Sequence, residues 1–143
     1  MTEGYRHSSI ADGTAAIMTL GLENGLKVDS TENPAIFTDE GLAQYDAVVF
    51  LSTTGNILDE SQQIAFQRFI QRGGGYIGIH AASDTEYEWP WYGQLVGGYF
   101  LNHPAIQEAR LIVEDPNDSS TRHLAAEWMH TDEWYNHRMV RDG

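Results

Sequence analysis

The sequence predicts an α/β protein with a mainly parallel sheet, and two patterns lead to this prediction. Strand-length apolar runs alternate with stretches whose apolar residues recur at helical spacing, which is typical of βαβ units. The run at residues 47–51 is apolar throughout, as expected for a strand buried on both faces of a parallel sheet. The length of 143 residues fits a single domain, which we place over residues 1–143.

The first half contains two helix signals and two strand signals. A helix begins near Ser8 or Ser9, either of which can cap it, and ends at Gly25. Residues 26–29 are predicted to form a short strand. A short helix runs from Asp39 to about Gln44, and the apolar strand at 47–51 follows it.

The segment from residue 59 onward contains a stronger helix signal. Asp59 and Gln62 have the spacing of a capping box, and an apolar stripe follows them. Three glycines at residues 73–75 end this helix, and residues 76–79 follow as a buried strand. Residues 109–114 form a further predicted strand.

Composition limits the classes of partner. The chain has 21 Asp and Glu against 8 Lys and Arg, and this acidic balance excludes a nucleic acid or an anionic membrane surface as the expected partner. A neutral small molecule such as a carbohydrate fits the charge. The start of the sequence, Met1–Gly4, has no secretory pattern, and no apolar run approaches the roughly 18 residues of a membrane span. We therefore expect a cytoplasmic protein.

His80 is the first candidate for a functional residue. It follows the strand at 76–79, and ligands bind at the carboxyl ends of strands in open parallel sheets. Asp84 lies four residues further on, close enough in sequence for a carboxylate to orient the imidazole. The alternative interpretation is a histidine that only satisfies a loop carbonyl.

Aromatic residues crowd into two segments that also carry histidines and carboxylates. Trp89 and Tyr92 stand in the first of these segments, and Trp134 stands in the second. Such rings either pad a connection against the sheet or form the walls of a pocket for a polyhydroxylated ligand.

Five motifs occur in an order that resembles the trehalose-utilisation (ThuA-like) family. They are Gly4-Tyr5-Arg6-His7-Ser8-Ser9-Ile10, Gly78-Ile79-His80-Ala81-Ala82-Ser83-Asp84-Thr85, Trp89-Pro90-Trp91-Tyr92-Gly93-Gln94-Leu95-Val96-Gly97, His103-Pro104 and Asp132-Glu133-Trp134-Tyr135. The resemblance covers nearly the whole chain.

The resemblance implies a flavodoxin-like, three-layer α/β/α fold similar to that of class I glutamine amidotransferases. In those enzymes the turn after the corresponding strand carries a nucleophilic cysteine, whereas this chain has His80 there and contains no cysteine. The resemblance therefore implies the fold of these enzymes but not their amidotransferase chemistry. Compared with the family, the chain is expected to lack the first strand and the C-terminal part, and a sheet with such a gap is expected to form a homo-oligomer.

The resemblance further implies a role in the catabolism of trehalose, related disaccharides or keto-sugars. We expect acid–base chemistry by a lyase, isomerase or hydrolase. The implied catalytic residues are His80, Asp84, His7 and Glu133; the implied substrate-binding residues are Tyr5, Arg6, Trp89, Tyr92, His103, Asp132, Trp134 and Tyr135.

Two alternatives stay open. The histidines and carboxylates also suit zinc or another divalent metal, which would make the protein a metal-dependent hydrolase, although no helical His-x-x-x-His spacing is present. The other alternative is a non-catalytic carbohydrate-binding or regulatory module, which would use the aromatic walls without needing His80. No glycine-rich fingerprint follows a strand and opens a helix, so a nicotinamide cofactor is not expected.

Overall fold

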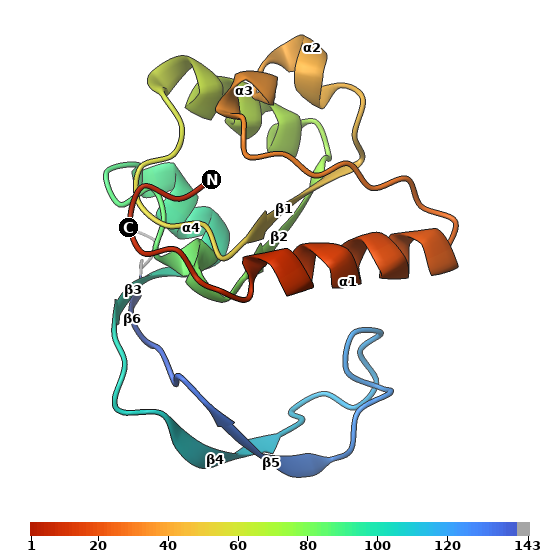
Figure 1. The fold of residues 1–143 in the computed structure, drawn as a ribbon, viewed down its shortest axis with the longest axis vertical. Coiled ribbons are helices and arrows are strands. Elements are labelled where there is room, and N and C mark those ends of the chain that lie inside the picture. The colour runs from red at the N-terminus through yellow and green to blue at the C-terminus, as the bar shows by residue number, and fades with distance from the viewer. Residues whose placement is uncertain (140–143) are drawn as a thin grey trace. The chain divides into compact units, whose positions relative to one another are not determined.

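The computed structural model describes residues 1–139 and divides them into two compact units. The first unit comprises Met1–Phe100 together with Arg138 and Met139, and the second comprises Leu101–His137. The helices all belong to the first unit, whereas the second is built from strands and loops (Figure 1). No helix within residues 1–139 is long and apolar enough to cross a membrane.

The first unit is built on a two-stranded parallel sheet. Strands β1 (Ala47–Leu51) and β2 (Gly75–Ile79) pair in parallel, with Val48 opposite Tyr76 and Phe50 opposite Gly78. Helix α3 (Glu60–Gln71) connects the two strands, which makes a βαβ unit. The strands predicted at 47–51 and 76–79 and the helix between them are confirmed.

The ends of α3 follow the predicted signals. The Asp59 carboxylate accepts a hydrogen bond from the Gln62 backbone N–H, and the Gln62 side chain accepts one from the Asp59 backbone N–H, both at 2.9 Å. At the other end Gly73 has φ of +99°, a conformation that glycine adopts without a steric penalty. The capping box and the glycine stop are therefore both confirmed.

The remaining helices of the first unit are shorter or less regular. Helix α1 (Ile10–Glu23) follows Ser9 and is terminated by Gly25, close to the predicted bounds. Helix α2 (Asp39–Leu42) ends before Gln44, so the predicted end is wrong by a few residues. The other helical segments are α4 (Pro90–Val96) and two 3₁₀ turns, η1 (Pro34–Ile36) and η2 (His80–Ser83).

Helices contact both faces of the parallel pair. Successive strand residues point to opposite faces. Phe50 stacks on Phe66 of α3 at 5.4 Å between ring centroids, whereas the next residue, Leu51, lies beside Gly13 of α1, where an added Cβ would come within 3.1 Å of it. Figure 1 shows α1 on one side of β1 and β2 and α3 on the other. The core lies on the α3 side.

The strand predicted at 26–29 is wrong. These residues form no strand, because they complete the turn that closes α1. The Leu26 backbone N–H donates to the Gly21 carbonyl at 2.8 Å. Val28 packs so tightly against Gly21 that an added Cβ would lie 2.3 Å from its side chain. Val28 therefore packs against a helix, and residues 26–29 do not pair as a strand.

The second unit contains an antiparallel strand pair. Strands β4 (Gln107–Ile112) and β5 (Glu127–Asp132) place Ala109 opposite His130 and Leu111 opposite Trp128. The strand predicted at 109–114 lies here, displaced by two residues. Strands β3 (Gly98–Asn102) and β6 (Asn136–Met139) pair where the chain passes from one unit to the other. The fold is therefore mixed α/β, with a small parallel sheet in the first unit and an antiparallel strand pair in the second.

Candidate functional site

His80 occupies a strained position at the carboxyl end of β2. Its backbone has φ of +53°, a left-handed conformation that is costly for a residue with a side chain. The turn requires a small residue two positions earlier, because a Cβ on Gly78 would lie 2.9 Å from the Tyr76 hydroxyl and 3.2 Å from Ala82. A strand, a strained residue and a helical turn form the arrangement by which hydrolases expose a nucleophile above a sheet. Here the arrangement exposes an imidazole.

Backbone strain is concentrated at this edge of the sheet. Within residues 1–139, the non-glycine residues with positive φ are Ser52 (+48°), His80 (+53°) and Glu86 (+55°). Ser52 directly follows β1 and His80 directly follows β2, while Glu86 stands in the loop beyond η2. Such residues persist only where the surrounding structure holds them, and they gather at functional sites.

His7 lies against His80. The two ring centroids are 4.6 Å apart with the planes at 81°, and the Tyr5 ring meets His7 edge-on at 4.9 Å. The N-terminal segment reaches this position because it runs beside the loop that follows β1. The Thr54 carbonyl accepts from the Glu3 N–H, and the Thr54 hydroxyl donates to the Tyr5 carbonyl, both at 2.9 Å.

Asp84 lies at the same edge and is bonded to a tyrosine. The Tyr87 hydroxyl lies 2.5 Å from an Asp84 carboxylate oxygen and 2.9 Å from the Phe100 carbonyl. The Asp84 carbonyl accepts from the Gly55 N–H at 2.9 Å, which joins the loops after β1 and β2. Asp84 therefore presents a carboxylate held by a phenol at the edge that also carries His80.

The two histidines also offer donors of the kind that a divalent metal binds. A ring nitrogen of His7 and one of His80 lie within 4.8 Å of each other. Imidazole nitrogens are common ligands of zinc, at about 2.0–2.1 Å each.

Arg6 and Tyr5, both expected to bind substrate, differ in their surroundings. Arg6 makes a bidentate pair with Glu32, with nitrogen–oxygen distances of 2.7 and 2.6 Å. The Arg6 guanidinium, through these hydrogen bonds, lowers the pKa of Glu32 from its usual 4.5 to about 2. Tyr5 is 72% exposed beside His7. Arg6 is therefore engaged by a carboxylate of this chain, whereas the Tyr5 ring is available to a ligand.

Tyr92 is not a wall of a pocket, which corrects the expectation. It is fully buried, its hydroxyl donates to the Ala82 carbonyl at 2.7 Å, and it stacks on Phe50. Burial raises the pKa of the Tyr92 phenol above its usual range. Trp89 likewise packs on the core, against Phe66. Tyr92 fills the space beneath η2, where an aromatic side chain wholly removed from water contributes most, and the partly buried Trp89 stacks on it.

Within the second unit, three of the expected residues contact one another. The His103 ring stacks on Tyr135 with centroids 5.8 Å apart, and its Nε2 lies 3.9 Å from a Glu133 carboxylate oxygen. Two further expected residues are engaged within this unit. Trp134 donates its indole N–H to the Gln107 carbonyl at 2.8 Å, and Asp132 lies 3.6 Å from His130. The roles expected for these residues stay predictions.

Three residues at the carboxyl edge were not predicted as site residues. They are Thr54, Glu86 and Tyr87. Each forms a side-chain hydrogen bond with a backbone group that is distant in the sequence. A pattern of spacing could not find Thr54 or Glu86. The only signal for Tyr87 was its place three residues after Asp84.

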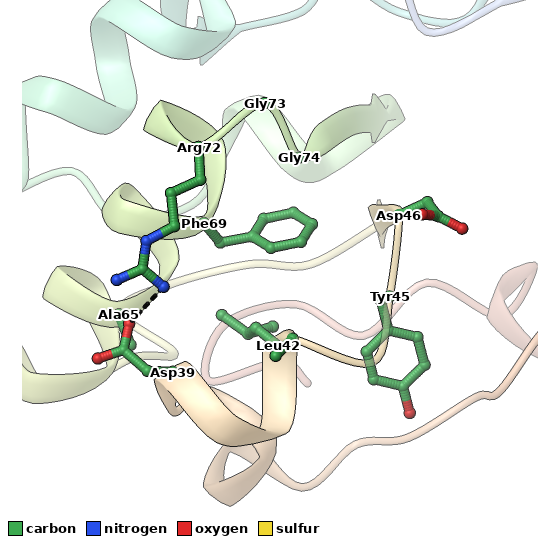
Figure 2. Close-up of a pocket in the computed structure, with 10 residues that line it drawn as sticks. Asp39, Leu42, Tyr45, Asp46, Ala65, Phe69, Arg72, Gly73 and Gly74 are labelled. Carbon is green, nitrogen blue, oxygen red and sulfur yellow. Dashed lines mark ion pairs between the residues drawn. The ribbon is translucent and has the colours of Figure 1, made fainter.

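An open pocket lies at the opposite, amino edge of the parallel sheet. It is lined by the residues just before β1 and β2 and by the facing sides of α2 and α3. Figure 2 shows Leu42 and Phe69 between the two elements, with the Arg72 guanidinium directed at Asp39 and lying 3.4 Å from it. This pocket carries none of the predicted site residues.

Comparison with known proteins identifies the family. The ThuA family model, described as trehalose utilisation, matches residues 1–143. A ThuA-like protein from Bacteroides uniformis ATCC 8492 has a crystal structure that matches with a TM-score of 0.80 and 26% identity, covering 95% of this chain and 58% of that one. A ThuA-like protein from Parabacteroides merdae ATCC 43184 matches with a TM-score of 0.69 and 19% identity, covering 94% of this chain and 60% of that one, and this second match supports the fold alone.

The chain thus spans about three fifths of the length of these two structures. No protein with a curated description matches it. Because the family model matches along the whole sequence, we conclude that the chain belongs to the ThuA family, the trehalose-utilisation family.

Proposed function

We propose that this chain carries the proton-transfer site of an enzyme that acts on a keto-sugar derived from trehalose or a related disaccharide. The observation on which this proposal rests is the contact between His7 and His80, with ring centroids 4.6 Å apart at the carboxyl edge of the parallel sheet. The family description, trehalose utilisation, supports the class of substrate.

Two imidazoles in contact suit a reaction that needs both a base and an acid. A neutral imidazole accepts a proton through one ring nitrogen, and a charged one donates. In the proposed reaction His80 takes the proton from the carbon beside the sugar carbonyl, and the electron pair of that C–H bond forms an enolate. When the carbonyl re-forms, the bond to the glycosidic oxygen breaks, and that oxygen receives a proton from charged His7. The net reaction is an elimination. Where the carbon that loses its proton carries a hydroxyl, transfer of that hydroxyl's proton to the enolate oxygen and protonation of the former carbonyl carbon would give an isomerisation instead.

The neighbouring groups suit the binding of a sugar. The exposed Tyr5 ring beside His7 offers a flat apolar face on which a sugar ring can stack. The Asp84 carboxylate, held by Tyr87, is an acceptor for a sugar hydroxyl. We propose these two residues for substrate binding. The roles of Glu133, His103 and the aromatic residues of the second unit are proposed from the family resemblance alone.

The second candidate function is a metal-dependent hydrolase. The approach of the two ring nitrogens to within 4.8 Å favours this candidate. In it, His7 and His80 would hold a divalent ion, which when bound would polarise a substrate oxygen or activate a water molecule. The chain's own contribution would be to orient the two rings, through Tyr5 on one side and the strained turn after β2 on the other.

The wider architecture and context are also proposals. Contacts of α1 and α3 with opposite faces of β1 support a three-layer, flavodoxin-like arrangement related to the class I glutamine amidotransferases. We propose a small-molecule carbohydrate as the ligand, because the net charge of −13 disfavours anionic partners. A homo-oligomer and a cytoplasmic location remain predictions.

The test is turnover of a panel of keto-disaccharides by the wild-type protein, His80→Ala and a control, His123→Ala. His123 is an exposed histidine of a polar turn in the second unit. Loss of His80 is expected to lower kcat by on the order of a hundredfold or more, whereas the control leaves it unchanged. Unchanged turnover in His80→Ala would refute the catalytic proposal, and retained sugar affinity without any turnover would favour the binding module. Turnover that chelation abolishes and zinc restores would favour the hydrolase.

A further inference from the structure

Glu86 is a buried carboxylate that the proposed chemistry does not use. Its side chain is 1% exposed. One carboxylate oxygen accepts from the backbone N–H groups of Ile57 and Leu58 at 2.7 and 2.8 Å, and the other accepts from the Gln63 side-chain amide at 2.6 Å. All three partners donate, so both oxygens serve as acceptors and the geometry is that of the ionised group. A buried charge with neutral partners is tolerated only when it is bonded in this way.

The backbone of Glu86 is held as firmly as its side chain. Its φ of +55° is in the left-handed region. Its N–H donates to the Gly55 carbonyl at 3.1 Å, and its carbonyl accepts from the Tyr99 hydroxyl at 3.0 Å. Glu86 therefore attaches the loop after η2 to the loop at residues 52–58, which we call the β1 loop.

The β1 loop in turn holds the segment that carries His7. Thr54, in the middle of this loop, bonds to both Glu3 and Tyr5 at 2.9 Å. The Tyr5 ring rests on His7, and His7 rests on His80. A continuous series of contacts thus runs from the Glu86 carboxylate through Thr54 and Tyr5 to the histidine pair.

His80 is held to the β1 loop by other bonds. The Ser52 N–H donates to the Ile79 carbonyl at 3.1 Å, and the Gly55 N–H donates to the Asp84 carbonyl at 2.9 Å. A β1 loop that lost the Glu86 carboxylate would still be tied to the end of β2. The segment carrying His7 is tied to the loop through Thr54, whereas His80 is also held by the backbone of β2, so a shift of the loop would displace His7 more than His80.

We propose that Glu86 is a positioning residue: its buried side chain fixes the β1 loop, and through Thr54 it holds His7 against His80. The catalytic consequence rests on the proposed function, but the placement of the two rings does not. Glu86 bonds backbone amides and Gln63, and acts on the site only through the loop.

The experiment compares Glu86→Ala, Glu86→Gln, Thr54→Val and a control, Glu88→Gln. Glu88 is an exposed glutamate two residues further along. The ring signals of His7 and His80 are followed by NMR on histidine-labelled protein at one pH, with the melting temperature and keto-sugar turnover measured in parallel. The chemical shift of a histidine ring depends on the position of the neighbouring aromatic ring. A variant that is less stable but keeps the two rings in contact would therefore leave the shift unchanged.

Glu86→Ala is expected to move the His7 signal most and the His80 signal less. Displacement of one reacting group should lower kcat more than it changes KM, by roughly tenfold to a hundredfold. Glu86→Gln should restore the signals, because its oxygen can serve the two backbone amides while the Gln63 amide turns to present its own oxygen. Thr54→Val, which removes the hydroxyl bonded to Tyr5, should move the His7 signal alone, and the control should move neither.

Folded Glu86→Ala with both ring signals at their wild-type positions would overturn the proposal. If Glu86→Ala does not fold, the other two variants decide. An unmoved His7 signal in Thr54→Val would then overturn the proposal. A moved His7 signal in Thr54→Val, together with wild-type signals in Glu86→Gln, would support the proposal. Absence of turnover in every variant, including the wild type, with the ring signals moving as expected would refute the proposed function and leave the positioning role standing.

Discussion

The two edges of the parallel sheet each have a residue in a left-handed backbone conformation, but the residue type differs. At the amino edge, the turn between α3 and β2 requires a left-handed residue, and the chain places Gly73 there with φ of +99°. At the carboxyl edge, the turn after β2 also requires one, and His80 stands there with φ of +53°. Glycine is the residue that removes the strain, so a histidine at this position supports the role proposed for the imidazole.

The polar contacts at the two edges differ in how far they are exposed to solvent. The amino edge has solvent-exposed ion pairs, in which Asp39 meets Arg68 and Arg72, around an open pocket. The carboxyl edge has buried hydroxyls, including the Thr53 and Thr85 side chains bonded to each other at 2.9 Å. Changes at the amino edge should therefore alter stability alone, and changes at the carboxyl edge should alter function.

The largest effect on stability is expected for Gly74→Ala at the amino edge. A Cβ at this position would lie 2.4 Å from two carbons of the Phe69 ring, which is itself part of the core. Overpacking of this kind costs about 1–3 kcal/mol of the free energy of unfolding. Urea denaturation measures the loss. Turnover per folded molecule should be unchanged, and a large fall in kcat would show that the edges are not separable.

A smaller effect on stability is expected at the carboxyl edge, where two substitutions of His80 distinguish the cost of its backbone conformation from the role of its side chain. His80→Gly should be more stable than His80→Ala by about 1 kcal/mol, because alanine keeps the cost of the left-handed backbone and glycine does not. Both variants should lack turnover. Equal unfolding free energies for the two variants would show that the left-handed backbone at residue 80 has no measurable cost.

A still smaller effect is expected for Asp39→Asn, which removes the partner of both arginines beside the amino-edge pocket. The side chains concerned are about half exposed, and exposed ion pairs contribute less than about 1 kcal/mol. Thermal unfolding should shift by a few degrees at most, and the shift should diminish in high salt. A loss of turnover in this variant would assign a functional role to the pocket of Figure 2.

The smallest effect concerns acid stability and the Arg6–Glu32 pair. The pKa of Glu32 is lowered from 4.5 to about 2, so the folded form binds its proton less readily than the unfolded chain. The stability that the pair contributes is therefore fully present above pH 4.5 and is lost as the pH falls toward 2. The difference in unfolding free energy between wild type and Glu32→Gln should shrink over that range. A difference that grew on acidification would contradict the assignment.

Much of the first unit could be predicted because its signals are local. The Asp59–Gln62 capping box, the glycine stop and the apolar run of β1 each lie within a few residues, and each gave the correct element. The strand predicted at 26–29 failed because Val28 packs on α1, and a short apolar segment does not show whether it packs on a helix or pairs as a strand. Tyr92 was misplaced because a pattern of aromatic residues does not tell which ring faces the core.

The candidate site shows the same division. The position of His80 at a strand end follows from the βαβ pattern, so the sequence could predict it. The part played by Glu86 could not be predicted, because its carboxylate bonds residues 23 to 29 positions away along the chain. The approach of His7 to His80 could be expected from the sequence, because the matched motifs place both residues at the carboxyl edge of the sheet, whereas the pairing of the N-terminal segment with Thr54 has no local signal.

The central claim, that His7 and His80 act as one unit, is tested most directly by a double-mutant cycle on turnover. The rates of wild type, His7→Ala, His80→Ala and the double variant are compared on the same keto-disaccharide, with circular dichroism confirming that each is folded. Residues that act together are strongly non-additive, so the double variant should be no slower than the worse single variant. A double variant whose loss equals the product of the two single losses would show that the histidines act independently, and it would contradict the account.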